Sequence, residues 1–207
     1  MLKQKTVAMM LVVALTLAFG AGVLAEGKTV YLEYEKEEDK DDYGPTLGID
    51  WEANEQWTLS LGYQFEGAGE NEAKTSLGAE YAIGENLSIG LRSEIADSEK
   101  KGCLELSGSR AINDPWALTG GVAYTYHWLD ADDDNYEELE LAAGVEFQAT
   151  EALLTSAQYV WTDPSNDENS KKWVIGAEYG IDKYGLYFEY EIPDDGYKAK
   201  IGISYNF

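Results

Sequence analysis

The only histidine of the chain, His127, lies in "YTYHWLD" and is the first residue whose type could support acid–base chemistry. Asp130 follows three positions later, so that a carboxylate is available to orient the imidazole ring. A catalytic centre also needs a nucleophile or a second acid–base group at a fixed geometry, and no such motif stands beside His127. The pattern therefore favours a protein that is not an enzyme, and we assign no catalytic residue.

The acidic run "DADDDN", residues 130–135, begins like a calcium-binding loop because its aspartates alternate. An EF-hand loop requires Gly at its sixth position and Glu at its twelfth, whereas this chain has Asn135 and Leu141 there. We interpret the run as a solvated acidic loop. The alternative is a loop that gathers divalent cations and, through them, lipopolysaccharide phosphates. We predict no metal site and no cofactor.

A larger set of charged residues occupies one face of alternating apolar and polar segments. Thirteen of its members are carboxylates: Glu33, Glu35, Asp50, Glu52, Glu66, Glu80, Glu94, Glu105, Glu140, Glu146, Glu178, Glu189 and Glu191. The bases on this face are Lys74, Arg92, Lys198 and Lys200, with Lys172 near one end. Burying so much like charge in a dry core would be unfavourable. We therefore predict that these residues line a water-filled pore.

Glycine recurs on the same face near the middle of the segments. The positions are Gly48, Gly62, Gly78, Gly90, Gly121, Gly144, Gly176 and Gly202. Glycine in a strand interior lowers the stability of the strand, so that its repeated occurrence there requires an explanation. Relief of wall curvature and an unobstructed bore are two possible reasons, and the sequence leaves both open.

The elements that carry these residues are short strands, because apolar residues recur with a period of two. We count twelve such segments: 28–36, 43–53, 57–66, 73–83, 87–96, 103–112, 116–129, 136–149, 153–162, 171–181, 185–192 and 197–207. The breaks between them alternate between short turns, such as "GEN", and longer acidic loops, such as "DSEKKG". This alternation is typical of an up-and-down antiparallel barrel of the outer membrane. The sequence therefore predicts an all-β transmembrane barrel of twelve strands, with ten as the alternative.

Tryptophan placement separates a membrane barrel from a soluble β-sandwich. All six tryptophans lie on the apolar face at or near a segment end: Trp51, Trp57 and Trp116 beside short turns, and Trp128, Trp161 and Trp173 beside acidic loops. A sandwich would bury tryptophan in mid-strand, whereas a membrane barrel places it at both interfaces. We therefore predict two aromatic belts at the membrane interfaces.

The first 25 residues have the layout of a secretory signal peptide. Lys3 and Lys5 precede an apolar run that ends in small residues, with cleavage expected after Ala25. Residues 26–207 then form a single barrel domain. The net charge of −24 makes nucleic acid an unsuitable partner. Cys103 is the only cysteine, so no disulfide within the chain is possible.

The final stretch, "YKAKIGISYNF", continues the strand pattern to an aromatic last residue. With the signal peptide and the twelve short strands, the ending "IGISYNF" resembles small monomeric outer-membrane porins, and in layout the oligogalacturonate-specific porin family. The resemblance implies a twelve-stranded channel for acidic sugar oligomers, with Tyr205 and Phe207 read as a signal by the bacterial outer-membrane assembly machinery. It also implies an arginine-rich lumen, whereas the only arginines here are Arg92 and Arg110.

Together these patterns predict a monomeric porin-like channel in the bacterial outer membrane. Its partners would be the lipid bilayer, the assembly machinery and small hydrophilic solutes. The excess of carboxylates predicts passive diffusion of cations or neutral solutes, because rings of carboxylates repel anions. Two alternatives remain: a non-conducting structural or surface-interaction barrel, and a channel for acidic oligosaccharides as the resemblance implies.

Overall fold

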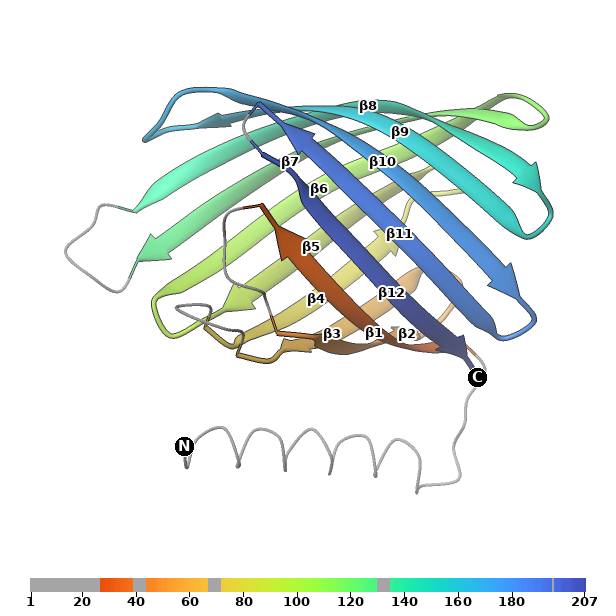
Figure 1. The fold of residues 1–207 in the computed structure, drawn as a ribbon, viewed down its shortest axis with the longest axis horizontal. Coiled ribbons are helices and arrows are strands. Elements are labelled where there is room, and N and C mark those ends of the chain that lie inside the picture. Colours follow the sequence, from red (N-terminus) through yellow and green to blue (C-terminus); the bar gives the residue numbers. More distant parts are fainter. Residues whose placement is uncertain (1–26, 39–43, 67–71, 130–134, 195) are drawn as a thin grey trace.

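The protein forms one closed antiparallel β-barrel, as the sequence predicts. The structure, a computed structural model, describes residues 27–38, 44–66, 72–129, 135–194 and 196–207. The predicted signal peptide and most of the acidic run 130–135 lie outside these residues. Figure 1 shows the strands crossing the barrel obliquely, with the first and last strands side by side.

The barrel contains the twelve strands predicted by the period-two pattern. Their bounds are β1 (Lys28–Glu37), β2 (Thr46–Glu52), β3 (Trp57–Gln64), β4 (Lys74–Ala82), β5 (Leu87–Ile95), β6 (Glu99–Asn113), β7 (Trp116–Leu129), β8 (Tyr136–Thr150), β9 (Leu153–Pro164), β10 (Ser170–Ile181), β11 (Tyr184–Pro193) and β12 (Lys198–Asn206).

Each strand pairs with its neighbours in the chain, and β12 pairs with β1 to close the wall. At this seam Thr29 lies opposite Asn206 and Glu37 lies opposite Lys198, so that nine residue pairs join the two strands. A closed sheet leaves no row of unpaired backbone groups at an edge. Closure therefore leaves no strand of the barrel as an edge strand.

The two ends of the barrel differ in their connections. Five short turns gather at one end, together with Lys28 and Phe207, whose backbone N–H donates to the carbonyl of Lys28 at 2.9 Å. We call this end the turn end. The opposite end carries the connections β1–β2, β3–β4, β5–β6, β7–β8, β9–β10 and β11–β12, and we call it the loop end. The predicted separation of short turns from the other connections is thus present.

One predicted loop is shorter than expected. The break "DSEKKG" was predicted to separate two strands, but β6 begins inside it at Glu99. The backbone N–H of Ala96 donates to the carbonyl of Glu99 at 2.8 Å, which closes a tight turn. The reason is pairing with β7, because Glu99 and Lys101 lie opposite Leu129 and His127. Backbone pairing extends the strand although its side chains there are charged.

The wall is uneven in height. The strands β6 to β10 contain 12 to 15 residues, whereas the other seven contain 7 to 10. In Figure 1 these longer strands, coloured green to light blue, form the far and upper part of the wall. The charged residues described below are therefore distributed over a wall with a tall side and a short side.

Candidate functional site

The apolar face of the strands points away from the barrel axis. Leucine and isoleucine side chains on this face are strongly exposed, including Leu91 at 62% and Ile201 at 58%. None of the described side chains is fully buried. The reason is that the wall is a single layer, so that one face of each strand borders the exterior and the other borders the lumen. The opposite face encloses the lumen and carries the charged residues.

A cavity of about 640 Å³ lies beside the short side of the wall and extends from the loop end, at Glu35 and Lys198, toward the turn end, at Thr29 and Ser204. It brings together all four bases predicted on this face, which come from the three strands β4, β5 and β12. The predicted residues that line it are Glu33, Glu35, Asp50, Lys74, Arg92, Glu94, Glu178, Lys198 and Lys200. Alternation within each strand and closure of the barrel together produce this convergence.

Three of the basic residues on the inner face form ion pairs across strand boundaries. Lys198 Nζ lies 3.1 Å from Glu35 Oε1, which connects β12 with β1 across the seam. Lys200 Nζ lies 3.6 Å from Glu189 Oε1. Lys172 Nζ lies 3.1 Å from Glu191 Oε2. The bases therefore neutralise carboxylates near the seam and on β11.

The turn-end half of the lumen has a different charge. A cavity of about 460 Å³ is lined by Glu80, Glu105, Glu140 and Glu146, and no lysine or arginine is among its lining residues in the described part of the chain. A neighbouring cavity of about 400 Å³ contains one base, Arg92, beside Asp50, Glu52, Glu80 and Glu105. The unpaired acidity of the lumen is thus concentrated toward the turn end and the tall side of the wall.

Two inward tyrosines, which the sequence analysis missed, explain part of the glycine row. Tyr31 lies opposite Gly48 and Tyr187 lies opposite Gly202 in the strand register. A Cβ atom at either glycine would collide with the facing tyrosine ring. The Tyr187 hydroxyl donates a hydrogen bond to Glu33. These glycines therefore make room for the tyrosine rings, which lie along the wall. This explanation differs from both reasons considered from the sequence, which were wall curvature and an open bore.

Other glycines in the row have different neighbours. At Gly90 a Cβ atom would meet only the Cβ of Glu105, at 3.9 Å. At Gly144 it would lie 2.6 Å from the carbonyl oxygen of Ala157, so that close approach of the next strand requires glycine there. The signal that could have found the tyrosine–glycine pairs is an inward Tyr in β1 and in β11, but only the register identifies the facing glycine.

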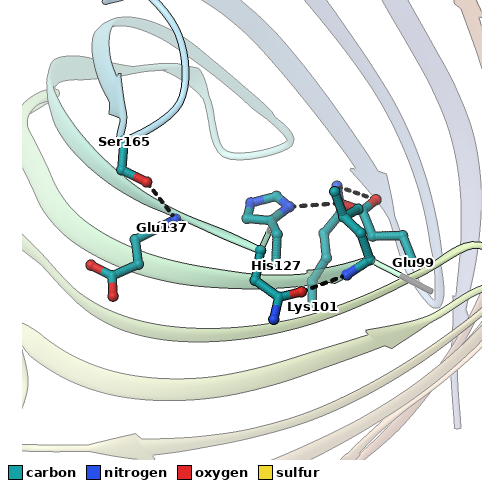
Figure 2. A network of polar contacts seen from close by, with 7 residues as sticks. Glu99, Lys101, His127, Glu137 and Ser165 are labelled. Carbon is teal, nitrogen blue, oxygen red and sulfur yellow. Dashed lines mark hydrogen bonds and ion pairs between the residues drawn. The ribbon is translucent and has the colours of Figure 1, made fainter. Parts of the chain in front are cut away.

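His127 lies at the loop end in a polar cluster on the tall side of the wall, which Figure 2 shows from nearby. Its side chain is almost fully buried, with a residue exposure of 3%. Nδ1 lies 2.7 Å from Glu99 Oε1, and Lys101 Nζ lies 3.2 Å from Glu99 Oε2. The ring stacks on Tyr136 with centroids 4.0 Å apart. Sequence analysis paired His127 with Asp130, which lies outside the described residues, and missed Glu99.

This cluster links β6, β7 and β8 where the connection between β7 and β8 begins. At the same end of the wall, the backbone N–H of Glu137 on β8 donates to Oγ of Ser165, the residue that follows β9, at 2.9 Å (Figure 2). The described partners of the imidazole are thus a carboxylate and an aromatic ring. We interpret His127 as a structural residue of the loop end.

Aromatic residues encircle the outward face near both ends. At the turn end the ring centroids of Trp57 and Tyr81 are 5.0 Å apart, and those of Trp116 and Phe147 are 4.7 Å apart. Trp51 lies at the same end and is exposed.

At the loop end Trp128 lies 4.7 Å from Tyr126 between ring centroids, and Trp173 lies 5.2 Å from Tyr159. Trp161 is half-buried on the same face. The predicted tryptophans therefore lie in two groups, one at each end.

The C-terminal residues belong to the turn-end group. The ring centroids of Tyr205 and Phe207 lie 4.8 Å apart, and Tyr205 also packs against Tyr184 at 5.0 Å. Lys183 Nζ lies 5.9 Å from the centre of the Tyr205 ring. The end of the chain is thus part of the folded wall.

Among the residues that the structure describes, no helix is long and apolar enough to cross a membrane. Within the same residues, no group of three or more His, Cys, Asp or Glu side chains could hold a metal ion.

No protein-family model and no curated protein matches the sequence, but solved structures match the fold. The KdgM porin in complex with disordered oligogalacturonate superimposes with a TM-score of 0.71 at 14% identity, covering 86% of this chain and 99% of that one. The NanC porin has a TM-score of 0.64 at 13% identity, covering 87% and 100%. An outer-membrane channel from Pseudomonas putida F1 has a TM-score of 0.61 at 10% identity, covering 89% and 97%. The resemblance to the oligogalacturonate porins is therefore confirmed for the fold, and the chain is a closed twelve-stranded barrel similar to these porins.

Proposed function

We propose that this protein is a bacterial outer-membrane channel for passive diffusion of small hydrophilic solutes, and that it favours cations and neutral solutes. The observation that carries the proposal is the enclosed polar lumen, in which Glu80, Glu105, Glu140 and Glu146 line a cavity that has no lysine or arginine among its described lining residues. The solved porins of similar fold support the class of function.

Placement in a membrane follows from the outward face. Exposed side chains such as Leu91, Leu118 and Ile201 would form large apolar patches in water, which soluble monomers rarely present. A bilayer removes this conflict, and the two aromatic groups then meet its two interfaces. In this orientation the turn end faces the periplasm, as in other outer-membrane barrels.

Selectivity follows from the distribution of charge. Carboxylates attract cations and repel anions, and a water-filled lumen between low-dielectric walls strengthens both effects. At the seam, Lys198 and Lys200 are engaged by Glu35 and Glu189, which reduces their attraction for anions. The acidic turn-end half therefore dominates the sign of the selectivity.

The test is the reversal potential of the folded barrel in a planar bilayer under a salt gradient. We expect discrete conductance steps with a higher permeability for potassium than for chloride. Replacing Glu105 and Glu140 together by Gln should lower this ratio, because both line the acidic cavity. Replacing Glu137 by Gln removes one negative charge from the outward face of β8 and should leave the ratio unchanged.

Each other outcome has a definite meaning. Anion selectivity of the unmodified protein would refute the charge argument. Folded protein without conductance steps would favour a non-conducting structural or surface-interaction barrel, which is the alternative from another functional class.

A channel for acidic oligosaccharides is the second candidate, and one observation favours it. Lys74, Arg92, Lys198 and Lys200 converge on the same cavity beside the short side of the wall. If an acidic sugar oligomer passes this cavity, short oligogalacturonates added on the loop-end side should block the current at low concentration. Neutral maltooligosaccharides of equal length serve as the matched control.

Assembly and oligomeric state belong to the same proposal. We propose that residues 1–25 are removed on export and that the assembly machinery inserts the remaining chain as a monomer. The barrel closes on itself through β1 and β12, so that no strand edge is left to recruit a second copy.

A further inference from the structure

The outward face has a groove on the tall side of the wall, near the turn end. It has a volume of about 470 Å³ and lies over β6 and β7, beside the first residue of β5. Leu87, Leu106, Leu118 and Val122 form its apolar sides. These side chains share the outward parity of their strands, and Leu118 is 50% exposed.

Two glycines that face each other across the register form the floor of this groove. Gly108 on β6 lies opposite Gly120 on β7, and both line the groove. A Cβ atom at Gly108 would lie 2.8 Å from the carbonyl oxygen of Asn86, so that close packing of the turn requires glycine there. At Gly120 a Cβ atom would meet only the carbonyl oxygen of Ala142, at 3.3 Å. The groove is therefore open above Gly120 and could be filled there by a larger side chain.

Arg110 lies at the turn-end side of the groove. It lines the groove, lies opposite Leu118 and is exposed. Within the described part of the chain, no ion pair, hydrogen bond or aromatic ring contact to its guanidinium is present. By contrast, Lys28 and Lys183 at the same end lie 5.9 Å from the ring centres of Trp51 and Tyr205, respectively.

An arginine on an apolar outward face needs an anion or access to water. Along β7 the outward positions run from Trp116 through Leu118 to Gly120, so that Arg110 lies one outward position inside the turn-end tryptophan. This is the depth at which phospholipid headgroups and acyl chains meet in the proposed orientation. Guanidinium binds phosphate through paired hydrogen bonds.

We propose that this groove binds one glycerophospholipid of the periplasmic leaflet. One acyl chain lies over Gly120 between Leu106 and Leu118, and the phosphate group contacts Arg110. The proposal depends on the membrane location described above but not on conduction through the lumen.

The combination of an apolar groove and a cation specifies this occupant. Free phosphate would use Arg110 but not the groove. A second copy docked symmetrically on the same face would bring two Arg110 side chains together, because symmetric dimers pair the same surface of both subunits. A phospholipid satisfies both parts of the site at once.

The experiment is native mass spectrometry of the folded barrel in mild detergent, titrated with dioleoyl phosphatidylglycerol. We expect one tightly bound lipid per barrel. Replacing Arg110 by Gln should weaken binding about tenfold, the size expected for loss of a charge-assisted hydrogen bond. Replacing Gly120 by Leu should weaken binding to a similar extent by filling the groove.

Two control variants make the same chemical changes elsewhere on the outward face. Lys171→Gln removes a positive charge from β10 at the loop end, and Ala177→Leu enlarges a small residue of β10. Both should bind the lipid as the unmodified protein does. Resistance to unfolding in unheated dodecyl sulfate establishes that each variant is folded. If Gly120→Leu does not fold, the comparison of Arg110→Gln with Lys171→Gln tests the proposal.

Several results would overturn the proposal. Equal binding by the unmodified protein and by Arg110→Gln would exclude a role for the guanidinium. If inorganic phosphate displaced the bound lipid as effectively as unbound lipid does, the apolar groove would contribute nothing to binding. A dimer that Gly120→Leu abolishes while lipid binding persists would assign the groove to a second copy of the chain. If lipid binds as proposed but no conductance is seen, only the channel function fails.

Discussion

Replacing Gly202 by Ala should destabilise the barrel, because the added methyl group would collide with the ring of Tyr187. If the ring stays in place, the overpacking costs about 1–3 kcal/mol. If the ring moves away, its hydrogen bond to the Glu33 carboxylate is lost, which costs about 1.5–3 kcal/mol for a bond to a charged group. In either case alanine lowers the conformational entropy of the unfolded chain relative to glycine, which offsets about 0.5–1 kcal/mol of the destabilisation.

The free energy of unfolding should therefore fall by about 1–2 kcal/mol relative to the unmodified protein. Gly90→Ala is the matched control, because the same methyl group there would meet only the Cβ of Glu105, at 3.9 Å. It should be neutral or slightly stabilising. The two variants should thus differ by about 2 kcal/mol, a factor of roughly 30 in the unfolding equilibrium constant.

The assay is equilibrium urea unfolding of the barrel in phospholipid vesicles, followed by tryptophan fluorescence. Tyr187→Phe separates the two contributions, because it keeps the ring and removes the hydroxyl that donates to Glu33. Combining Gly202→Ala with Tyr187→Ala should remove most of the penalty caused by the collision. Equal stability of Gly202→Ala and Gly90→Ala would refute the reasoning.

Three further predictions address the chain end, the loop end and the lumen. Deletion of Phe207 should lower the amount of barrel at the cell surface, because its ring packs on Tyr205 beside the seam; unchanged surface levels would argue against an assembly signal. Replacing Glu99 by Ala should reduce the free energy of unfolding by about 1–3 kcal/mol, because it leaves Nδ1 of the buried His127 without its partner. The exposed turn residue Glu85 is the control, and an equal effect of Glu85→Ala would contradict the assignment. Raising the salt concentration from 0.1 to 1 M should weaken the cation preference, since the screening length falls from about 10 Å to about 3 Å; a preference that does not change with salt would mean that the carboxylates do not produce it.

The faces of the strands could be predicted from the sequence because alternation is a local property. Each residue of "WTLSLGYQ" points to the side opposite its neighbour, so that Trp57 and Leu59 share one face and Thr58 and Ser60 the other. The number of alternating segments predicted the number of strands, and the turn lengths and tryptophan positions distinguished the two ends of the barrel. This information was sufficient for the closed twelve-stranded barrel and for the two faces on which the charged residues and the tryptophans lie.

The register between strands was decided only by the tertiary structure. Sliding a strand by two residues leaves every side chain on its original face, so that alternation cannot determine which residues lie at the same height. Closure of the barrel makes that choice, and it places Tyr31 on Gly48 and Gly108 opposite Gly120. The gathering of the bases in one cavity, the pairing of His127 with Glu99 and the groove beside Arg110 follow from the same choice. The amino-acid sequence by itself therefore determined which residues face the lumen, and the closed fold determined which of them meet.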